Sequence, residues 1–307
     1  MAARKVGFIG LGAMGEGQSG NLLARGFAVR GYDIDAAAMD RLAAAGGEAA
    51  ASPAEAARDA DLLIVLVFTA AQAEEVLFGP DGAVSTLPAG ATVVLHTTGR
   101  AEDARRIAER LGETGHLMLD APVTGGKAGA DAGTLTAIVS GPDEAYAAAL
   151  PALEAMAATI RRVGTGPGAA STIKMASQVL VGLNGLAMVE AFALATKAGA
   201  DPNAMLDVAL SGFGRSTVIE KLAPFMLAGN FDPRGATAIM VKDLRIARDT
   251  AQALGLELPG VETALARFEA TAEAGYERAD FPSMIKLYER QGGIDVAAAA
   301  RGGKAEG

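Results

Sequence analysis

Three glycines near the start of the chain have the spacing of a phosphate-binding turn. They lie in the run Gly10-Leu11-Gly12-Ala13-Met14-Gly15, which follows a short apolar stretch and precedes an expected helix. The first glycine permits a tight turn, the second lets the backbone approach a pyrophosphate, and the third allows the helix to pack closely on the strand. The amino end of the helix then faces the negative charge of the phosphates. We therefore expect these six residues to bind a dinucleotide.

Asp33 indicates which dinucleotide is bound. It closes the second expected strand, about 20 residues after the glycines, where a carboxylate accepts hydrogen bonds from the adenine ribose hydroxyls. Its negative charge would repel the 2′-phosphate of NADP, and no arginine follows it immediately. We predict that the cofactor is NAD and that NADP is the less favoured dinucleotide. The alternative is a structural turn in which Asp33 serves only as a surface cap.

The elements that must position these residues follow an alternating pattern from residue 4 to about residue 163. The expected strands are 6–9, 28–32, 62–67, 92–95, 117–119 and 134–139, and helical runs such as 36–45, 53–58, 71–77 and 101–111 lie between them. Strands separated by helical segments form right-handed crossovers within a mostly parallel sheet. We therefore predict an α/β, dinucleotide-binding domain over residues 1–164.

The character of the chain changes after Gly164-Thr-Gly166-Pro-Gly168. No clear strand follows, and residues 171–198 form one expected helix whose middle is apolar nearly all round. A soluble helix of that kind must be buried on several sides, and a second subunit could supply part of the cover. We expect an all-helical substrate and oligomerisation domain over residues 165–291, a homodimer or homotetramer formed through it, and a mobile tail over residues 292–307.

The composition excludes several classes of protein and site. The formal net charge of −9 argues against a nucleic-acid binder, which needs a basic face. The chain has no cysteine and only two histidines, His96 and His116, so we predict no metal site. The most apolar short run, residues 62–68, is far shorter than the roughly 20 residues of a membrane span. We expect a cytoplasmic protein that binds no membrane.

Four motifs, occurring in the same order, resemble the 3-hydroxyisobutyrate dehydrogenase (β-hydroxyacid dehydrogenase) family. Besides the glycine run they are Asp120-Ala-Pro-Val-Thr-Gly-Gly126 with the following Ala130-Asp-Ala-Gly-Thr-Leu-Thr136, Gly164-x-Gly166 leading to Lys174, and Lys242-Asp243-Leu244. The resemblance covers residues 5–290. It implies a Rossmann-like, doubly wound domain joined by a long helix to an all-helical domain. It also implies hydride transfer between the nicotinamide and the hydroxyl-bearing carbon of a small acid.

The resemblance also assigns roles to individual residues. Thr124, Gly125 and Gly126 match the loop that holds the substrate carboxylate, Lys174 the catalytic lysine, Thr98 a cofactor-contacting threonine, and Lys242 the lysine that closes over the cofactor. A Thr-Gly-Gly turn can present a hydroxyl and bare backbone amides to a carboxylate with little obstruction. A plain strand-to-loop turn is the alternative for that loop.

Lys174 is the expected general acid and base. The alcohol proton must be accepted as hydride leaves for NAD⁺, and an unperturbed lysine, with a pKa of about 10.4, is a poor base at neutral pH. Burial and the positive nicotinamide ring both disfavour the charged form, so we expect the pKa of Lys174 to be lowered. A salt-bridged helix lysine is the alternative.

Gln178 lies one helical turn after Lys174, so both side chains share a helix face. Most members of the family carry a substrate-binding asparagine there, and glutamine keeps the amide but reaches further. With Ser171-Thr172 ahead of it, Gln178 resembles the L-threonate dehydrogenase branch. We expect a 3-hydroxyisobutyrate-like or threonate-like substrate. The alternatives are an NAD(P)H-dependent reductase of aldehydes or imines, against which Lys174 argues, and a catalytically silent cofactor-binding module.

Overall fold

The computed structural model describes residues 4–302, and they divide into two compact units. Unit 1 ends at Met175 and unit 2 begins at Ala176. The division lies within helix α8 (Ala169–Lys197), which begins in unit 1 and continues into unit 2. The boundary expected at residue 164 coincides with the end of the last strand, and the first turn of α8 still packs on unit 1, where Ala170 and Ser171 are buried.

Unit 1 is built on one sheet, which has nine strands within residues 4–302. The strands are β1 (Lys5–Ile9), β2 (Ala28–Tyr32), β3 (Glu48–Ala49), β4 (Leu62–Val65), β5 (Thr92–Leu95), β6 (Leu117–Asp120), β7 (Val123–Thr124), β8 (Leu135–Ser140) and β9 (Ala157–Gly164). Their order is β3-β2-β1-β4-β5-β6-β8-β7, with β9 paired to β8. The six strands from β3 to β6 in this order are parallel, and β8 is antiparallel to β6 and β7. The order reverses between β1 and β4, which is the ligand-binding switch point of a doubly wound sheet.

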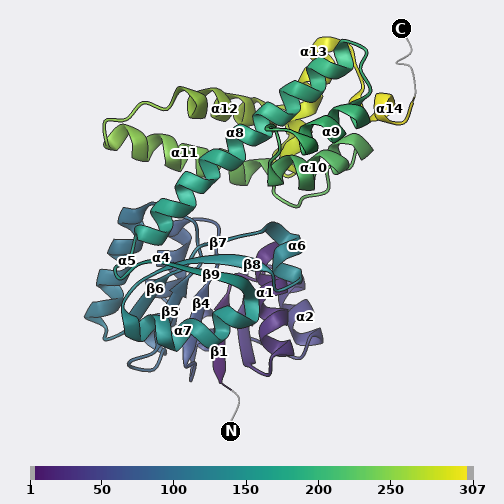
Figure 1. The fold of residues 1–307 in the computed structure, drawn as a ribbon. Helices are drawn as coiled ribbons and strands as arrows, with labels where there is room; N and C mark the ends of the chain where they lie inside the picture. The colour runs from purple at the N-terminus through teal and green to yellow at the C-terminus, as the bar shows by residue number, and fades with distance from the viewer. Residues whose placement is uncertain (1–3, 303–307) are drawn as a thin grey trace. The chain divides into compact units, whose positions relative to one another are not determined.

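Helices cover both faces of this sheet (Figure 1). They are α1 (Ala13–Ala24), α2 (Ala36–Ala44), α3 (Pro53–Ala57), α4 (Ala70–Phe78), η1 (Ala83–Ser85), α5 (Ala101–Glu113), α6 (Gly126–Asp131) and α7 (Asp143–Met156). Strand β4 shows why both faces need cover: Leu62 and Ile64 enter the core beneath α1, α2 and α7. Leu63 and Val65 enter the core beneath α3, α4 and α5. Alternate side chains of a strand point to opposite faces, so a continuous apolar strand is buried on both.

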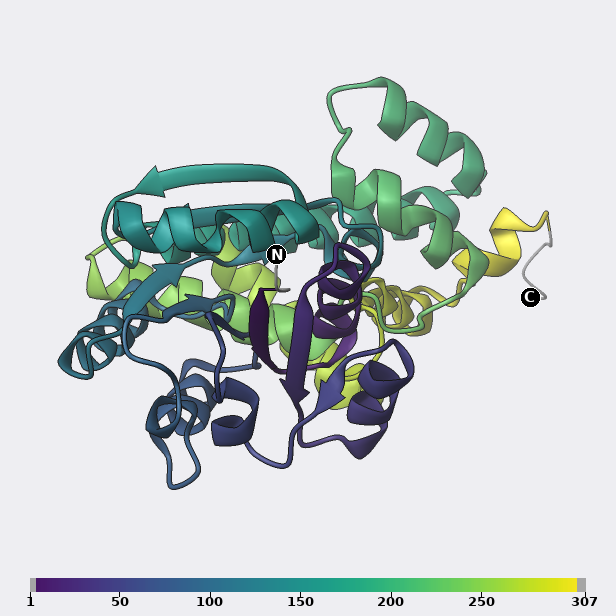
Figure 2. The same cartoon turned by 90° about the horizontal axis from the view of Figure 1, so that it is seen from below.

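All six expected strands are present, and the structure contains three further strands that the sequence pattern did not predict. Two of them, β3 and β7, have only two residues each. The third, β9, has a half-exposed side-chain pattern that includes Arg161 and Arg162, so it lacks an apolar run. It runs beside β8, and α7 lies along both (Figure 2). The helix α7 continues directly into β9 at Ala157 without a glycine or proline to mark the change.

Unit 2 is helical apart from one isolated bridge between Ala236 and Asp280 in the described part of the chain. After α8 it contains α9 (Pro202–Ser211), α10 (Thr217–Ala228), α11 (Thr237–Ala253), α12 (Pro259–Thr271), η2 (Ala272–Tyr276), η3 (Phe281–Met284), α13 (Ile285–Gly292) and α14 (Val296–Ala300). Its core includes Met188, Val189 and Phe192 of α8. Among residues 4–302, α8 is the helix long and apolar enough to cross a membrane, a property that core helices share.

The mobile tail expected from residue 292 is replaced in the structure by a short packed helix. Asp295 caps α14 by accepting a hydrogen bond from Ala298 N at 2.8 Å. Val296 is fully buried in the core of unit 2. The expectation was wrong for residues 292–302. The segment has few large apolar residues, so the sequence did not indicate that its one valine anchors it. The rest of the expected tail lies outside the described residues.

Candidate functional site

The glycine run connects β1 to α1 at the carboxyl edge of the sheet. Gly10 has φ +98, and a Cβ there would lie 2.0 Å from the carbonyl oxygen of Leu66. A Cβ on Gly15 would lie 2.0 Å from the carbonyl oxygen of Gly10. A Cβ on Gly12 would meet nothing of the chain within 4 Å. Gly10 and Gly15 are therefore required by the protein's own packing, whereas Gly12 leaves open space on the ligand side.

Asp33 is tied directly to this turn. Leu11 N donates a hydrogen bond to Asp33 Oδ2 at 2.6 Å, and Asp35 N donates to Asp33 Oδ1 at 2.9 Å. The cap of α2 is Asp35, which accepts from Ala37 N, so Asp33 is not the helix cap of the alternative interpretation. A carboxylate has about four acceptor positions, and two bonds leave it capacity for ribose hydroxyls. The carboxylate is thus held beside the glycine turn.

The residues present fit a dinucleotide. Helix α1 begins at Ala13 with Gly12 as its N-cap, and no side chain caps it. A helix N-terminus without a side-chain cap presents backbone N–H groups and a partial positive charge to an anion. Ile34 follows Asp33 and is 90% exposed, so no cation occupies the next position for a 2′-phosphate. The uncapped turn, the open Gly12 and Asp33 together suit NAD.

The Thr124-Gly125-Gly126 loop is anchored to the same helix. Asn21 Nδ2 donates to the carbonyl oxygen of Ala130 in α6 at 2.7 Å. A Cβ on Gly17 would lie 2.6 Å from the Ala130 carbonyl carbon, so α1 and α6 are in backbone contact. Gly125 and Gly126 have φ +134 and φ +65, which favour glycine at both positions. The dinucleotide turn and this loop are therefore positioned by one helix.

Two polar residues after β5 fix the neighbouring strand ends. Val67 N donates to Thr97 Oγ1 at 3.1 Å, which links the ends of β4 and β5. His96 Nδ1 donates to the carbonyl oxygen of Ala121, which links β5 to the segment after β6. Burial lowers the pKa of His96 to about 4, despite the opposing effect of this hydrogen bond. His96 is therefore a neutral structural tether, and Thr98 follows it half-buried at the same edge.

Asp120, the last residue of β6, caps the start of α8. Its carboxylate accepts from Gly168 N at 2.9 Å, from Ser171 N at 3.0 Å and from Ser171 Oγ at 2.8 Å. Ser140 Oγ lies 3.4 Å from the same carboxylate and accepts from Ala170 N at 3.0 Å. Burial raises the pKa of Asp120, and the hydrogen bonds oppose that rise. This network fixes the first turn of α8 to the sheet.

Lys174 lies one helical turn after Ser171 and is buried, with 6% of its surface exposed. Thr124 lies four residues after Asp120 in the chain. The Asp120 carboxylate therefore links the end of β6, from which the chain continues to the Thr-Gly-Gly loop, to the helix start that precedes the lysine. The sequence motif included Asp120 but gave it no role, because its partners lie 48 and 51 residues further along the chain.

In unit 2, the expected site residues form a second cluster. Gln178 Nε2 donates to Asp243 Oδ2 at 2.6 Å, and Lys242 Nζ donates to Asp243 Oδ1 at 2.7 Å. Asp243 is 3% exposed and Gln178 is 7% exposed. Asp243 therefore holds both Lys242 and Gln178.

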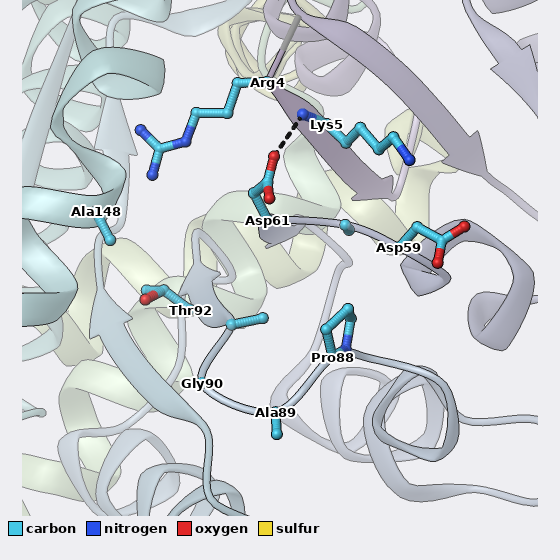
Figure 3. A pocket seen from close by; sticks show the side chains of 11 residues that line it. Arg4, Lys5, Asp59, Asp61, Pro88, Ala89, Gly90, Thr92 and Ala148 are labelled. Atoms are coloured by element: carbon cyan, nitrogen blue, oxygen red, sulfur yellow. Dashed lines mark hydrogen bonds between the residues drawn. The ribbon is translucent and has the colours of Figure 1, made fainter. Parts of the chain in front are cut away.

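A cavity of about 710 Å³ lies at the opposite edge of the sheet in unit 1 (Figure 3). Arg4 and Lys5 at the start of β1, Asp61 before β4 and Thr92 at the start of β5 line it. Figure 3 shows Lys5 N donating to Asp61, at 2.9 Å. Ligands of doubly wound sheets bind at the carboxyl ends of strands, so this cavity is not the candidate site. In the described residues no group of three His, Asp or Glu side chains could hold a metal ion.

Two protein-family models match most of the chain. Residues 5–164 match the NAD binding domain of 6-phosphogluconate dehydrogenase. Residues 168–288 match the model described as NAD-binding of NADP-dependent 3-hydroxyisobutyrate dehydrogenase. Among curated proteins, the L-threonate dehydrogenase of Cupriavidus necator is 40% identical over 286 residues, covering 93% of this chain and 96% of that protein.

Solved structures confirm the predicted fold class. The 3-hydroxyisobutyrate dehydrogenase of Salmonella typhimurium is similar with a TM-score of 0.87 and 38% identity, covering 92% of this chain and 99% of that one. The 3-hydroxyisobutyrate dehydrogenase of Mycobacterium tuberculosis, in a structure with L-serine, has a TM-score of 0.82 and 30% identity. It covers 93% of this chain and 99% of that one.

The glycine geometry predicts that two alanine substitutions affect different properties, one cofactor binding and the other stability. Gly12→Ala should leave stability unchanged but raise the Kd for NAD⁺ about 10-fold, a loss of about 1.4 kcal/mol, because its Cβ enters the ligand's space. Gly15→Ala should lower stability by about 1–3 kcal/mol, because its Cβ collides with the Gly10 carbonyl. Calorimetric titration and urea denaturation measure both. Gly20→Ala on α1, where a Cβ meets nothing within 4 Å, is the control. Equal destabilisation by the first two variants would contradict this division of roles.

The lowered pKa of His96 predicts acid sensitivity. The imidazole of His96 binds the proton with a pKa of about 4 in the folded protein and with the ordinary histidine pKa of 6.5 in the unfolded chain. The contribution of His96 to the free energy of unfolding is therefore fully present above pH 6.5. It is lost as the pH falls from there toward 4. Between pH 7 and pH 4.5 the wild type should lose about 2 to 3 kcal/mol more than His96→Gln in urea denaturation. The raised pKa of Asp120 acts in the opposite direction but is common to both proteins. Parallel pH profiles would exclude His96 as the cause.

Proposed function

Since this chain belongs to the 3-hydroxyisobutyrate dehydrogenase family of NAD-dependent hydroxy-acid oxidoreductases, we propose that its substrate is a threonate-like acid and that Lys174 is the general acid and base. The similarity to an L-threonate dehydrogenase along both units is the observation that carries this proposal. Gln178, in place of the family's usual asparagine, supports the same branch.

In this proposal Thr124, Gly125 and Gly126 hold the substrate carboxylate. Thr124 is half-buried and both glycines are exposed, so a hydroxyl and unobstructed backbone amides are available to an anion. Local donors are needed because a net charge of −9 gives an anionic substrate no long-range attraction. The anchoring of this loop to α1 through Asn21 keeps the donors in place before the substrate arrives.

Lys174 handles the proton of the reacting hydroxyl. When bound, NAD⁺ would supply the acceptor for the hydride of the hydroxyl-bearing carbon, and NADH would supply the hydride in the reverse direction. In oxidation the neutral amine of Lys174 accepts the hydroxyl proton, and in reduction its ammonium donates a proton to the carbonyl oxygen. The burial of Lys174 limits competing proton exchange with water, and Gln178, one turn later on α8, contacts the same substrate.

The cofactor is held by the glycine run Gly10–Gly15, by Asp33 at the adenine ribose, by Thr98 after β5 and by Lys242 of α11. Of these, the glycine run and Asp33 have the geometric support given above, with Leu11 N donating to the carboxylate at 2.6 Å. The open position at Gly12 is where the pyrophosphate would approach the backbone. Thr98 and Lys242 are assigned by their matches to the family motifs.

The helical unit is also proposed to form a homodimer or homotetramer, in the cytoplasm. Several large apolar side chains of unit 2 are exposed, among them Leu180 at 64%, Leu194 at 72% and Val208 at 66%. Leu180 and Leu194 lie on α8, the helix whose apolar sequence suggested a subunit contact. A monomer in sedimentation velocity measurements would contradict this assembly.

The substrate proposal predicts the result of a screen of hydroxy acids. With NAD⁺, L-threonate should give a kcat/KM about 10-fold or more above 3-hydroxyisobutyrate, glycerate, serine and phenylserine, because the site is expected to bond additional hydroxyls. Reduction of NAD⁺ is followed by the absorbance of the NADH that forms. A preference for 3-hydroxyisobutyrate would contradict the threonate assignment. Equal efficiency with NADP⁺ would contradict the role given to Asp33.

The proposed role of Lys174 predicts that Lys174→Ala lowers kcat by about 10²- to 10⁴-fold, the usual contribution of a general acid or base. The Kd for NAD⁺ should stay close to the wild-type value, because the dinucleotide residues lie elsewhere. Lys197→Ala at the far end of α8, where the lysine is exposed and donates to the Gly292 carbonyl, is the matched control. Near-normal turnover of Lys174→Ala would remove Lys174 from the mechanism.

A further inference from the structure

Asp243 accepts hydrogen bonds from two side chains with different proposed roles, one at the cofactor and one at the substrate. Its Oδ1 accepts from Lys242 Nζ, the residue expected at the cofactor, at 2.7 Å. Its Oδ2 accepts from Gln178 Nε2, the residue expected at the substrate, at 2.6 Å. Asp243 is 3% exposed, and the side chain of Lys242 is 16% exposed. These bonds form inside unit 2, out of bulk water, where charged hydrogen bonds are strong.

Close packing of α8 on α11 sets this geometry. A Cβ on Gly182 would lie 2.9 Å from a side-chain carbon of Leu244, so the two helices meet with no side chain on α8 between them. Gln178 lies one turn before Gly182, and Asp243 directly precedes Leu244. The contact at Gly182 therefore brings the Gln178 amide and the Asp243 carboxylate together. Both helices are long, with 29 and 17 residues, so the pair is held on rigid elements.

The Asp243 carboxylate determines which end of the Gln178 side-chain amide lies next to it. An ionised carboxylate only accepts hydrogen bonds, and Asp243 forms an ion pair with Lys242. The NH₂ group of Gln178 must therefore point toward Asp243, and Nε2 also lies 3.9 Å from Met240 Sδ. Both N–H groups thus have acceptors on α11. The carbonyl oxygen is the end that points away from Asp243, and its two lone pairs accept from any donor it meets.

We propose that Asp243 is a positioning residue that turns the Gln178 carbonyl oxygen toward the substrate, where it accepts a hydrogen bond from a substrate hydroxyl. The inference rests on the proposed function and narrows it. The substrate must carry a hydroxyl group besides the one that is oxidised, because an acid without it leaves the Gln178 oxygen without that donor. A site built to bond a hydroxyl selects strongly against analogues that lack it.

A simpler role for Asp243 makes a different prediction. If it only held Lys242, its loss would weaken turnover of every acid by the same factor. The ratio of kcat/KM between two acids that differ by one hydroxyl separates the two roles, because damage to folding or to cofactor binding cancels in that ratio. The acids are L-threonate and its analogues 2,3-dihydroxybutanoate and 2,4-dihydroxybutanoate, each of which lacks one hydroxyl. An analogue that lacks the oxidised hydroxyl is compared by its Kd alone.

The wild type should prefer L-threonate over the analogue without the bonded hydroxyl by about 10- to 100-fold, as expected for one buried hydrogen bond. Gln178→Met removes the oxygen and should reduce this ratio to within about threefold of unity. Asp243→Leu frees the amide to rotate and should do the same. Asp243→Asn should restore part of the ratio, because its carbonyl oxygen can still accept from Gln178 Nε2. Lys242→Met should lower kcat/KM for all three acids and keep the ratio.

Two results would overturn the inference: no preference in the wild type, or an equal loss for all three acids in both Gln178→Met and Asp243→Leu. The same ratios are measured as Kd values by calorimetry in the presence of NADH, which needs no turnover. Absence of reaction with every acid would contradict the proposed function, while unchanged Kd ratios in the variants would contradict the role of Asp243. The two failures are therefore distinguishable.

Discussion

The buried carboxylate of Asp120 at the start of α8 is the contact on which the arrangement of unit 1 depends. Removing a carboxylate from water is costly, and here the cost is offset by backbone N–H groups of Gly168 and Ser171 and by the Ser171 hydroxyl. The negative charge also lies at the positive end of a 29-residue helix. One strand end thus fixes the first turn of a long helix against the sheet, close to the turn that carries Lys174.

Other contacts at the same edge use the backbone in a similar way. Strand ends that carry ligand-binding loops have few partners of their own, because the sheet ladder stops there. The neutral imidazole of His96 and the hydroxyl of Thr97 supply such partners between adjacent strands. Asn21 does so between α1 and α6. Polar side chains that bond to the backbone of neighbouring segments hold these loops, and this gives the edge its preorganised shape.

The sequence predicted the strands and turns that are set by residues close together in the chain. It missed the strands that are set by pairing with distant segments. Continuous apolar runs predicted the parallel strands because both faces of such strands are covered. The spacing of the glycines predicted their separate roles, which the positions of Gly10 and Gly15 explain. The two-residue strands β3 and β7 exist only through their pairing partners and carry no pattern of their own.

The candidate site shows the same limit. The motifs placed Asp120, Lys174, Gln178 and Asp243 in the chain, but the bond from Gln178 to Asp243 spans 65 residues and that from Ser171 to Asp120 spans 51. Residue spacing within a motif does not predict contacts between residues so far apart in the chain. The role of Asp120 as a cap and the orientation of the Gln178 amide emerge only once the helices are packed. The resemblance to a family identified site residues, and the fold supplies the reasons for their geometry.

The unbroken course of α8 also limits how a site of this kind can diversify. Each residue of an α-helix turns the chain by about 100°, since 3.6 residues make one turn. Insertion of a single residue between Lys174 and Gln178 would rotate the amide by that angle and carry it away from Asp243. Natural variation here should therefore proceed by exchange of side chains at constant length. Insertions and deletions should accumulate instead in surface connections such as the one between α9 and α10, residues 212–216.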